Sequence, residues 1–231
     1  MTNNLISIKN LKYKIGQNIN FSLNIKNFKL NKSDSILIYG ESGLGKSTFL
    51  NLLSGTISPQ KGNIDILGTN ISNTSSSIKD KIRGDHFGIV FQTFNLLPYV
   101  SVKNNILLGK AYSSIKQSKS NNDEIKELMD KLSLNYEDLI NRKAYELSIG
   151  QQQRVAVARA LIGKPEIILA DEPTGSLDHN TAKEVFKILY KLKDKNRLII
   201  YATHNRFFAN MADCKLEMID GNIKPINARI S

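Results

Sequence analysis

The sequence predicts an α/β fold with a mixed, largely parallel core sheet, because short apolar runs alternate with helical patterns. The run at 35–39 (SILIY) is followed by a glycine-rich loop and then by a helical pattern. Two further strand-like runs, 167–172 ending in two acids and 198–204 ending in histidine, flank an amphipathic helix, which is the order of a right-handed β-α-β crossover. Strict alternation from Ile19 to Ile25 indicates a half-buried strand, so we expect an N-terminal antiparallel β subdomain.

The length of 231 residues suits a single domain with an inserted lobe. We expect a core of about 1–92 and 162–231 and a mostly helical subdomain of about 93–161. Cys214 is the only cysteine, which excludes an internal disulfide. No apolar run approaches the roughly 20 residues that span a bilayer, and the first ten residues lack the apolar segment of a signal peptide. These features predict a soluble or peripheral protein.

The net charge of +11 allows three interpretations: a nucleic-acid partner, an anionic membrane surface, or solvated lysines. The lysines are scattered along the sequence, there is no tryptophan, and no nucleic-acid-binding signature is present. Dispersed solvation is therefore the first expectation, and attraction to an anionic membrane is the second. No direct nucleic-acid partner is expected.

The loop after the first buried strand fits the phosphate-loop pattern G-x-x-x-x-G-K-[ST]. Its glycines allow consecutive N–H groups to face one anion, with the positive end of the following helix behind them. Lys46 can reach the β- and γ-phosphates, Ser47 can bind Mg²⁺, and Thr48 can reach the α-phosphate. The pattern arises by chance in about one per cent of chains of this length, given average glycine usage. The predicted nucleotide-binding residues of the loop are Gly40, Glu41, Ser42, Gly43, Gly45, Lys46, Ser47 and Thr48.

Polar residues follow three other strand-like runs. Gln92, Asp171, Glu172 and His204 stand at carboxyl ends, where open parallel sheets bind their ligands. Each residue alone has a structural explanation of about even weight. The acids could cap a helix, and the histidine could be a loop residue whose ring nitrogens are hydrogen-bonded within the fold. Together with Gly40 of the phosphate loop they mark four strand ends at one edge of the sheet, which favours a shared site.

Phosphoryl transfer to water assigns a role to each of these groups. Asp171 fits a Walker-B acid that holds Mg²⁺, and Glu172 is placed to polarise the attacking water. Gln92 can bridge the metal and the water, and His204 can donate a hydrogen bond to the γ-phosphate. The predicted metal ligands are Ser47, Gln92 and Asp171, and the predicted catalytic residues are Glu172, His204 and Gln92.

Two further positions are ambiguous on spacing alone. Tyr13 lies in a lysine-flanked stretch and is equally suited to stacking on an adenine ring and to ordinary packing. Ser148 and Gly150 precede a strong helical pattern, so they offer a second anion-facing helix N-terminus. Simple capping by Ser148 is the better interpretation of that motif taken by itself.

Taken in chain order, these motifs resemble the ATPase subunits of ABC transporters over nearly the whole chain. The matching stretches are GESGLGKST, the Gln92 loop, LSIGQQQRVAVARAL, IILADEPTGSLD and His204. LSIGQ resembles the signature that separates this family from other phosphate-loop proteins. FGIVFQTFNLLP and ADEPTGSLD are most similar to the LolD/MacB/FtsE-type branch. The resemblance implies the ABC-ATPase fold of phosphate-loop NTPases and hydrolysis of ATP with Mg²⁺.

The resemblance also implies an assembly. A head-to-tail homodimer would close over two ATP molecules, with Ser148, Gly150 and Gln151 of one subunit meeting the γ-phosphate held by Lys46 of the other. Asp178 would lie at the dimer seam.

Two further expectations come from the resemblance. Tyr13 becomes the expected adenine stacker, and the segment after Gln92 would contact the coupling helices of an integral membrane permease subunit. The subunit would then lie at the cytoplasmic face of the inner membrane, as a peripheral protein.

The sequence departs from the family pattern at Ile149, where the signature usually has its first glycine. A positive φ would be unfavourable for isoleucine. We expect that the substitution is tolerated, because its backbone N–H can still donate to phosphate and its side chain points away from the phosphate.

Three functions are compatible with these motifs. The leading one is the motor subunit of a transporter for export or extraction of lipoprotein, lipid, peptide or drug. The main alternative is a non-transporting ATPase that drives a membrane protein of the cell-division or cell-wall type. A soluble ABC ATPase acting on nucleic acid or ribosomes is disfavoured, because such proteins commonly carry two ATPase units or a long coiled-coil insert.

Overall fold

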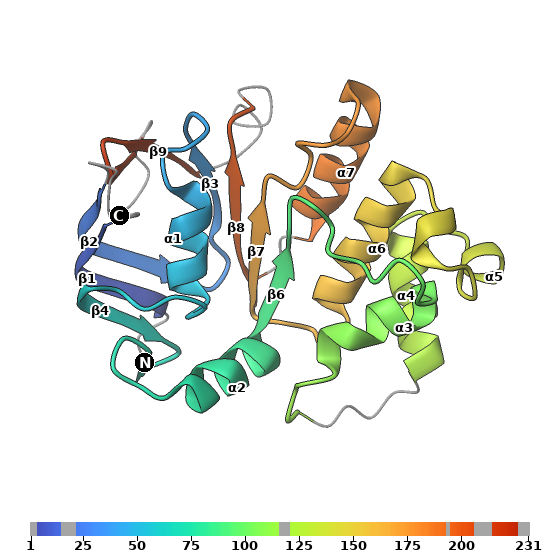
Figure 1. Cartoon of the computed structure of the whole chain (residues 1–231), viewed down its shortest axis with the longest axis horizontal. Helices are drawn as coiled ribbons and strands as arrows, with labels where there is room; N and C mark the ends of the chain where they lie inside the picture. Colours follow the sequence, from blue (N-terminus) through green and yellow to red (C-terminus); the bar gives the residue numbers. More distant parts are fainter. Residues whose placement is uncertain (1–3, 15–21, 116–120, 193–194, 206–213, 226–231) are drawn as a thin grey trace. The chain divides into compact units, whose positions relative to one another are not determined.

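A computed structural model of the chain describes residues 4–14, 22–115, 121–192, 195–205 and 214–225 (Figure 1). The chain divides into two compact units, the first of residues 1–83 and 193–231 and the second of residues 84–192. The elements are those of the predicted α/β fold, with an antiparallel β subdomain, a mixed sheet and a helical part. The boundaries expected for the helical subdomain, about 93–161, stay a prediction.

The first unit contains the predicted N-terminal antiparallel sheet, with strand order β2-β1-β4-β5. Apolar side chains of β1 such as Ile6, Ile8 and Leu11 are fully buried, and the Phe28 ring of β2 packs edge-on against Phe49 at 6.2 Å between centroids. Ile19 and Phe21 of the expected alternating strand lie outside the described residues. The strands are β1 (Asn4–Lys14), β2 (Ser22–Asn31), β4 (Lys61–Ile66) and β5 (Thr69–Asn70).

The same unit holds strands of the mixed sheet in the order β10-β9-β3-β8. Strand β3 pairs in parallel with β8 and with β9, and β9 pairs antiparallel with β10 across a turn at Asp220 and Gly221. Strands β3 and β8 are almost wholly buried, as their apolar composition predicts. The bounds are β3 (Ser35–Tyr39), β8 (Leu198–Thr203), β9 (Cys214–Ile219) and β10 (Asn222–Pro225).

Helix α1 (Lys46–Leu53) follows β3, as predicted, and its end is set by Gly55. Gly55 has φ +69°, a left-handed conformation that glycine adopts without a Cβ penalty. Helix α2 (Ser76–His86) was not among the predicted elements. It begins in a serine-rich stretch, and its Ile78 is 46% exposed, so its sequence shows little of the apolar periodicity by which a helix is recognised.

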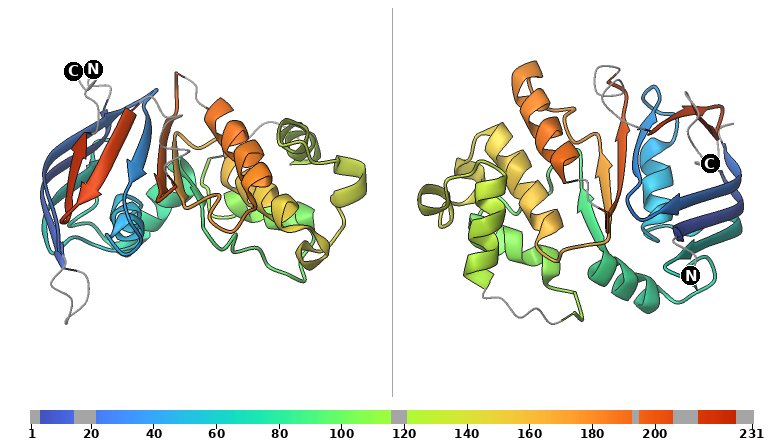
Figure 2. Two further views of the ribbon diagram at one scale, coloured as in Figure 1. Left: turned by 90° about the horizontal axis from the view of Figure 1, so that it is seen from above. Right: turned by 180° about the vertical axis from the view of Figure 1, so that it is seen from behind.

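The second unit pairs β6 with β7 in parallel and contains most of the helices. Helix α6 packs closely on its neighbours, because a Cβ at Gly88 or Gly109 would lie 2.1 or 1.8 Å from a carbonyl oxygen of α6. Both views in Figure 2 show α6 and α7 side by side. The elements are β6 (Phe87–Val90), α3 (Val102–Leu107), η1 (Leu108–Lys110), α4 (Asn121–Lys131), α5 (Tyr136–Leu139), η2 (Ala144–Glu146), α6 (Ile149–Leu161), β7 (Ile167–Asp171) and α7 (His179–Lys191).

Among the described residues, no helix combines the length and the hydropathy that a bilayer crossing requires.

The buried carboxylate Asp85 anchors the loop after η1. Its oxygens accept hydrogen bonds from the Ser113 hydroxyl at 3.0 Å and from the hydroxyl and backbone N–H of Ser114, both at 2.6 Å. Burial opposes ionisation, but the hydrogen bonds from Ser114 and Ser113 and the neighbouring His86 outweigh it and lower the pKa of Asp85.

We expect Asp85→Asn to lower the free energy of unfolding by about 1–3 kcal/mol at pH 7, because a buried charge-assisted network is broken. Since the folded pKa lies below the unfolded value of about 3.9, the wild-type contribution is present above that value. It is lost as the pH falls through the folded pKa. Urea unfolding at pH 7 and near pH 3 measures both effects.

The exposed Asp130→Asn change is the matched control and should leave the unfolding free energy within about 0.5 kcal/mol. Equal losses of unfolding free energy in the two variants would contradict the stabilising role of Asp85. A difference between Asp85→Asn and wild type that does not change with pH would contradict it as well.

Candidate functional site

The phosphate loop turns through two left-handed glycines, Gly43 at φ +86° and Gly45 at φ +89°. A Cβ at Gly43 would meet no atom within 4 Å, so glycine is required there by the backbone conformation and not by space. Gly45 precedes the first residue of α1 and provides no side-chain cap. The N–H groups of the first helical turn are therefore left for another acceptor, which is the arrangement of an anion site.

Lys46 is only 5% exposed, which is unusual for a lysine. Its Nζ donates hydrogen bonds to the carbonyl oxygens of Gly40 at 2.8 Å and Glu41 at 3.0 Å. The ammonium group is thus held against the backbone of its own loop. Ser47 is exposed and Thr48 is half-buried in the same turn of helix.

Two other predicted residues belong to this unit. Tyr13 is half-buried near the end of β1, where its Cα partner is Leu23 of β2. His204 follows β8 directly and is exposed. The preceding Thr203 is buried, and its Oγ1 accepts the backbone N–H of Asn205 at 3.1 Å, which shapes the turn that presents the histidine.

The second unit holds the predicted acids at the end of β7. Glu172 begins a tight turn with Pro173, in which the Glu172 carbonyl accepts the Gly175 N–H at 3.0 Å. A Cβ at Gly175 would lie 3.5 Å from the Cβ of Glu172 and 3.7 Å from the Nε2 of Gln92. The structure therefore brings Gln92 and Glu172 together around Gly175.

The backbone of Glu172 has φ +44°, a conformation that L-residues other than asparagine and aspartate rarely adopt. The residue is also 7% exposed, so a carboxyl group is both buried and placed on a strained backbone. Such outliers concentrate at functional sites. Sequence reasoning missed this strain, and it also missed Gly175, whose only sequence signal was the Pro-Thr-Gly turn pattern.

The signature motif lies at the start of α6. Ser148 is the N-cap, and its Oγ accepts the Gln151 N–H at 3.3 Å, while the Gln151 Oε1 accepts the Ser148 N–H at 3.0 Å. This reciprocal capping box is the structural role that the sequence already allowed for Ser148. Ser148 remains exposed, so its capping role leaves one side of the motif open to solvent.

Asp178 caps the neighbouring helix α7. Its Oδ1 accepts the backbone N–H groups of Asn180 at 3.0 Å and Thr181 at 3.2 Å, and hydrogen bonding by Thr181 lowers the pKa of the Asp178 carboxyl. A Cβ at Gly150 would lie 2.8 Å from Cγ2 of Thr181. The structure therefore places the N-termini of α6 and α7 against each other.

Ile149 is the first residue of α6 and has a helical backbone with negative φ. Its side chain is 57% exposed. The departure from glycine therefore causes no backbone strain at this position.

The segment after Gln92 is fixed to α6 by Arg159. The guanidinium donates to the carbonyls of Phe94 and Asn95, two residues with positive φ, and burial lowers the pKa of Arg159. Beyond this anchor the chain exposes large apolar side chains. They are Leu97 at 48%, Tyr99 at 78% and Tyr145 at 54%, and the two tyrosine rings pack 5.6 Å apart.

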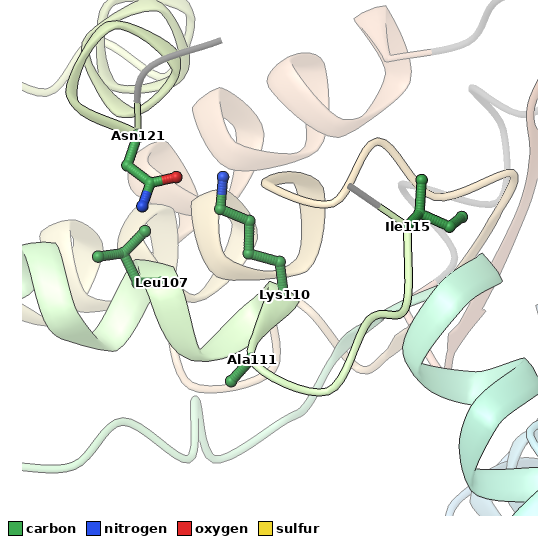
Figure 3. A pocket seen from close by; sticks show the side chains of 5 residues that line it. All are labelled: Leu107, Lys110, Ala111, Ile115 and Asn121. Carbon is green, nitrogen blue, oxygen red and sulfur yellow. The ribbon is translucent and has the colours of Figure 1, made fainter. Parts of the chain in front are cut away.

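A hollow of about 340 Å³ lies elsewhere in the second unit (Figure 3). Its lining residues are Leu107, Lys110, Ala111, Ile115 and Asn121. The Lys110 Nζ is paired with the buried Glu124 at 2.7 Å, so its charge already has a partner. None of the predicted site residues lines this hollow. Among the described residues, no group of three or more His, Cys, Asp or Glu side chains is placed to hold a metal ion.

Comparison with known proteins decides the family. The ABC transporter family matches residues 23–175, which is more than half of the chain. The chain belongs to the ABC transporter ATP-binding family. The predicted family and fold are thereby confirmed, and ATP hydrolysis is the reaction of this class.

Curated relatives of this ABC ATPase fall in the predicted branch. The ABC transporter ATP-binding protein YtrE of Bacillus subtilis is 40% identical over 194 residues, which cover 84% of this chain and 83% of that protein. The macrolide export ATP-binding/permease protein MacB of Bdellovibrio bacteriovorus is 36% identical over 222 residues. Those residues cover 95% of this chain but only 33% of MacB, so the chain spans about a third of that relative.

Solved structures show the same fold. The ATP-binding cassette MJ0796, described as dimeric in a post-hydrolysis state with ADP and Pi, superposes with a TM-score of 0.79 and 32% identity. The match covers 96% of this chain and 99% of that one.

Proposed function

We propose that this ABC ATPase is the motor subunit of a membrane transport complex. In this complex, ATP binding closes a dimer of ATPase subunits, and the closure drives a conformational change in a permease. The observation that carries the proposal is the phosphate loop, in which two left-handed glycines lead into a helix that has no side-chain cap and whose first residue is the buried Lys46. The same chain carries the family signature at the start of α6.

In this proposal the loop amides and Lys46 bind the phosphates of ATP, Thr48 contacts the α-phosphate, and Tyr13 stacks on the adenine. Glu172 polarises the attacking water, and His204 donates to the γ-phosphate. The exposed imidazole of His204 supports the last role. The further loop residues that contribute backbone contacts are Gly40, Glu41, Ser42, Gly43 and Gly45.

The donor set fits Mg²⁺, which prefers hard oxygen ligands and keeps several waters. Ser47 offers an exposed hydroxyl, Gln92 an exposed amide oxygen, and Asp171 a carboxylate at the end of β7. When bound there, Mg²⁺ would neutralise charge on the β- and γ-phosphates.

The proposed dimer is head to tail. Ser148, Gly150 and Gln151 of one subunit face the γ-phosphate bound by the other, and Asp178 lies at the seam. The packing of Gly150 against Thr181 supports this arrangement, because it holds the signature and the α7 cap as one surface.

The permease-facing surface in this proposal comprises Leu97, Tyr99 and Tyr145 (the apolar patch). Exposed apolar side chains gathered on one part of a chain are typical of a protein contact, and Arg159 holds the segment that presents them. The location that follows is the cytoplasmic face of the cell membrane. Cargo of the lipoprotein, lipid, peptide or drug type is proposed from the similarity to MacB.

A pull-down tests the function. Tagged Glu172→Gln protein is recovered from membranes in mild detergent with ATP and Mg²⁺. A polytopic partner at near one-to-one stoichiometry is the expected result. Recovery only from the soluble fraction, especially with RNA, would overturn the transport function.

The matched variant adds Leu97→Ser and Tyr99→Ser to Glu172→Gln. It should retain ATP binding and lose the polytopic partner, because only the apolar patch is changed. Undiminished recovery of that partner would remove the patch from the permease contact.

Ile149→Gly should change ATP turnover by less than about tenfold, or 1.4 kcal/mol of barrier. The isoleucine already has helical φ and an exposed side chain, so its backbone N–H is positioned as that of glycine would be. Steady-state phosphate release at saturating ATP measures the effect, with Ile149→Ala as the intermediate control. A larger rise would identify Ile149 as an attenuator of hydrolysis.

A further inference from the structure

The antiparallel sheet of the first unit collects positive charge on one face. The first 33 residues contain six lysines and no acidic residue, within a chain of net charge +11. The expectation of dispersed lysines rests on their spacing along the chain, which does not reveal which side of a sheet a residue occupies. Strand register does reveal it.

The register assigns these lysines to the side opposite the core. Lys9 is the Cα partner of Asn27 and Asn63, and Lys14 is the partner of Ser22, so polar residues oppose polar residues. Ile8 and Leu11 point to the other side, where they are fully buried. The exposed lysines on the outer side, called the lysine face below, are Lys9, Lys12, Lys14, Lys29 and Lys61.

One carboxylate offsets only part of the charge of the lysine face. Asp65 of β4, the one acid that the described strands β1, β2 and β4 carry, is the Cα partner of Ser7 and lies on the same side as Lys9, against five lysines. In the view from above in Figure 2, α1 and strands β3, β9 and β10 all lie on one side of this sheet. The lysine face is the other side.

Lys12 and Lys61 are direct Cα partners on neighbouring strands. Like charges in that position destabilise a sheet, because their Cβ atoms lie only about 5 Å apart. The lysines spread over roughly 15 Å along β1 and across three strands spaced about 4.8 Å apart. Their fields overlap, since these separations are comparable to the Debye length of about 8 Å at physiological salt.

We propose that the lysine face binds the anionic phospholipid surface of a membrane. Its charges are distributed in two dimensions, as the headgroups of a leaflet are. The described residues of the three strands include no arginine to clamp a phosphate bidentately, and Tyr13, which alternates with Lys12 and Lys14, lies on the side opposite the lysine face. That composition favours a diffuse anionic plane over a nucleic acid.

The same composition sets the kind of binding. No large apolar side chain of β1, β2 or β4 is exposed, so nothing inserts into the bilayer. Binding is electrostatic, requires acidic lipid and is reversed by salt. It goes beyond the proposed motor function, since it needs neither nucleotide nor permease.

The test is flotation of the purified chain with vesicles of 70% phosphatidylcholine and 30% phosphatidylserine, against pure phosphatidylcholine. Wild type should float only with the acidic vesicles at 50 mM salt and should be released at 500 mM. Lys9→Gln/Lys12→Gln/Lys29→Gln should partition roughly one hundredfold less, because each lysine contributes about fivefold.

The matched control removes the same charge elsewhere, as Lys131→Gln/Lys187→Gln/Lys191→Gln, at three exposed helix positions of the second unit. It should keep vesicle binding within about threefold of wild type. Unchanged melting temperatures establish that both variants are folded. The experiment contains no ATP, so failure of the motor function would not affect its outcome.

Three results would overturn the proposal. One is an equal loss of vesicle binding in both triple variants, which would show that binding depends on net charge and not on the lysine face. Another is flotation with pure phosphatidylcholine. The third is a face variant that keeps vesicle binding and loses binding to a single-stranded RNA probe, which would assign the lysine face to nucleic acid.

Discussion

Glu172→Gln is expected to reduce the kcat of ATP hydrolysis by at least about a hundredfold while ATP binding is retained. The substitution keeps the size of the side chain but removes its ability to polarise water, and positioned general bases contribute about 10²–10⁴ in rate. The residue is 7% exposed and is packed beside Gly175, so we expect the new amide to keep the position of the carboxylate. Nucleotide affinity depends on the phosphate loop, which the change does not touch.

Phosphate release under saturating ATP measures the rate, and gel filtration with ATP and Mg²⁺ should show an accumulated dimer. Glu137→Gln is the control, since Glu137 is an exposed residue that forms a surface salt bridge with Lys126. It should behave as wild type. Turnover of Glu172→Gln at the wild-type rate would remove Glu172 from the base role.

The position of Glu172 illustrates what sequence alone can supply. The apolar run before it predicts a buried strand, and the acids at its end follow from the chain order. The φ of +44° does not follow, because it is imposed by the turn through Pro173 and the hydrogen bond from Gly175. The proximity of Gln92 is likewise a tertiary fact, since 80 residues separate it from Glu172.

The elements that were predicted share one property, which is a strong local pattern. Strands β3, β7 and β8 are short apolar runs with polar ends, and α6 and α7 have long amphipathic repeats with caps. Helix α2 lacks such a pattern and owes its place to tertiary contacts, such as that from Arg83 to the Ser54 carbonyl at 3.0 Å. The β9-β10 hairpin does carry a local signal, because Asp220 and Gly221 both have positive φ, as a two-residue hairpin turn requires.

Surfaces were the least predictable part. Ser148 could be assigned a cap from the sequence, because capping is local. The lysine face required the register of three strands, and one of these, β4, comes from a distant part of the sequence. A shift of one residue would move the same lysines into the core side, so composition could not decide between dispersed and gathered charge.

Lys46→Ala should lower ATP affinity by about one hundredfold, or 2.7 kcal/mol. Its Nζ lies against the loop carbonyls of Gly40 and Glu41, so the positive charge is held within the loop that we expect to surround the phosphates. The loop amides remain in the variant, which is why binding should weaken and not vanish. Alanine is also a good helix former at the first position of α1, so the fold should persist.

Titration with a fluorescent ATP analogue measures the affinity, and Lys187→Ala serves as an exposed-lysine control expected to match wild type. Lys46→Arg separates charge from shape: it keeps the positive charge but presents a planar fork in a buried position. Intermediate affinity for Lys46→Arg would show that both the charge and the compact ammonium matter. Wild-type affinity in Lys46→Ala would contradict the assignment of this loop as the phosphate site, because the buried ammonium is the only lysine among the described residues 40–48.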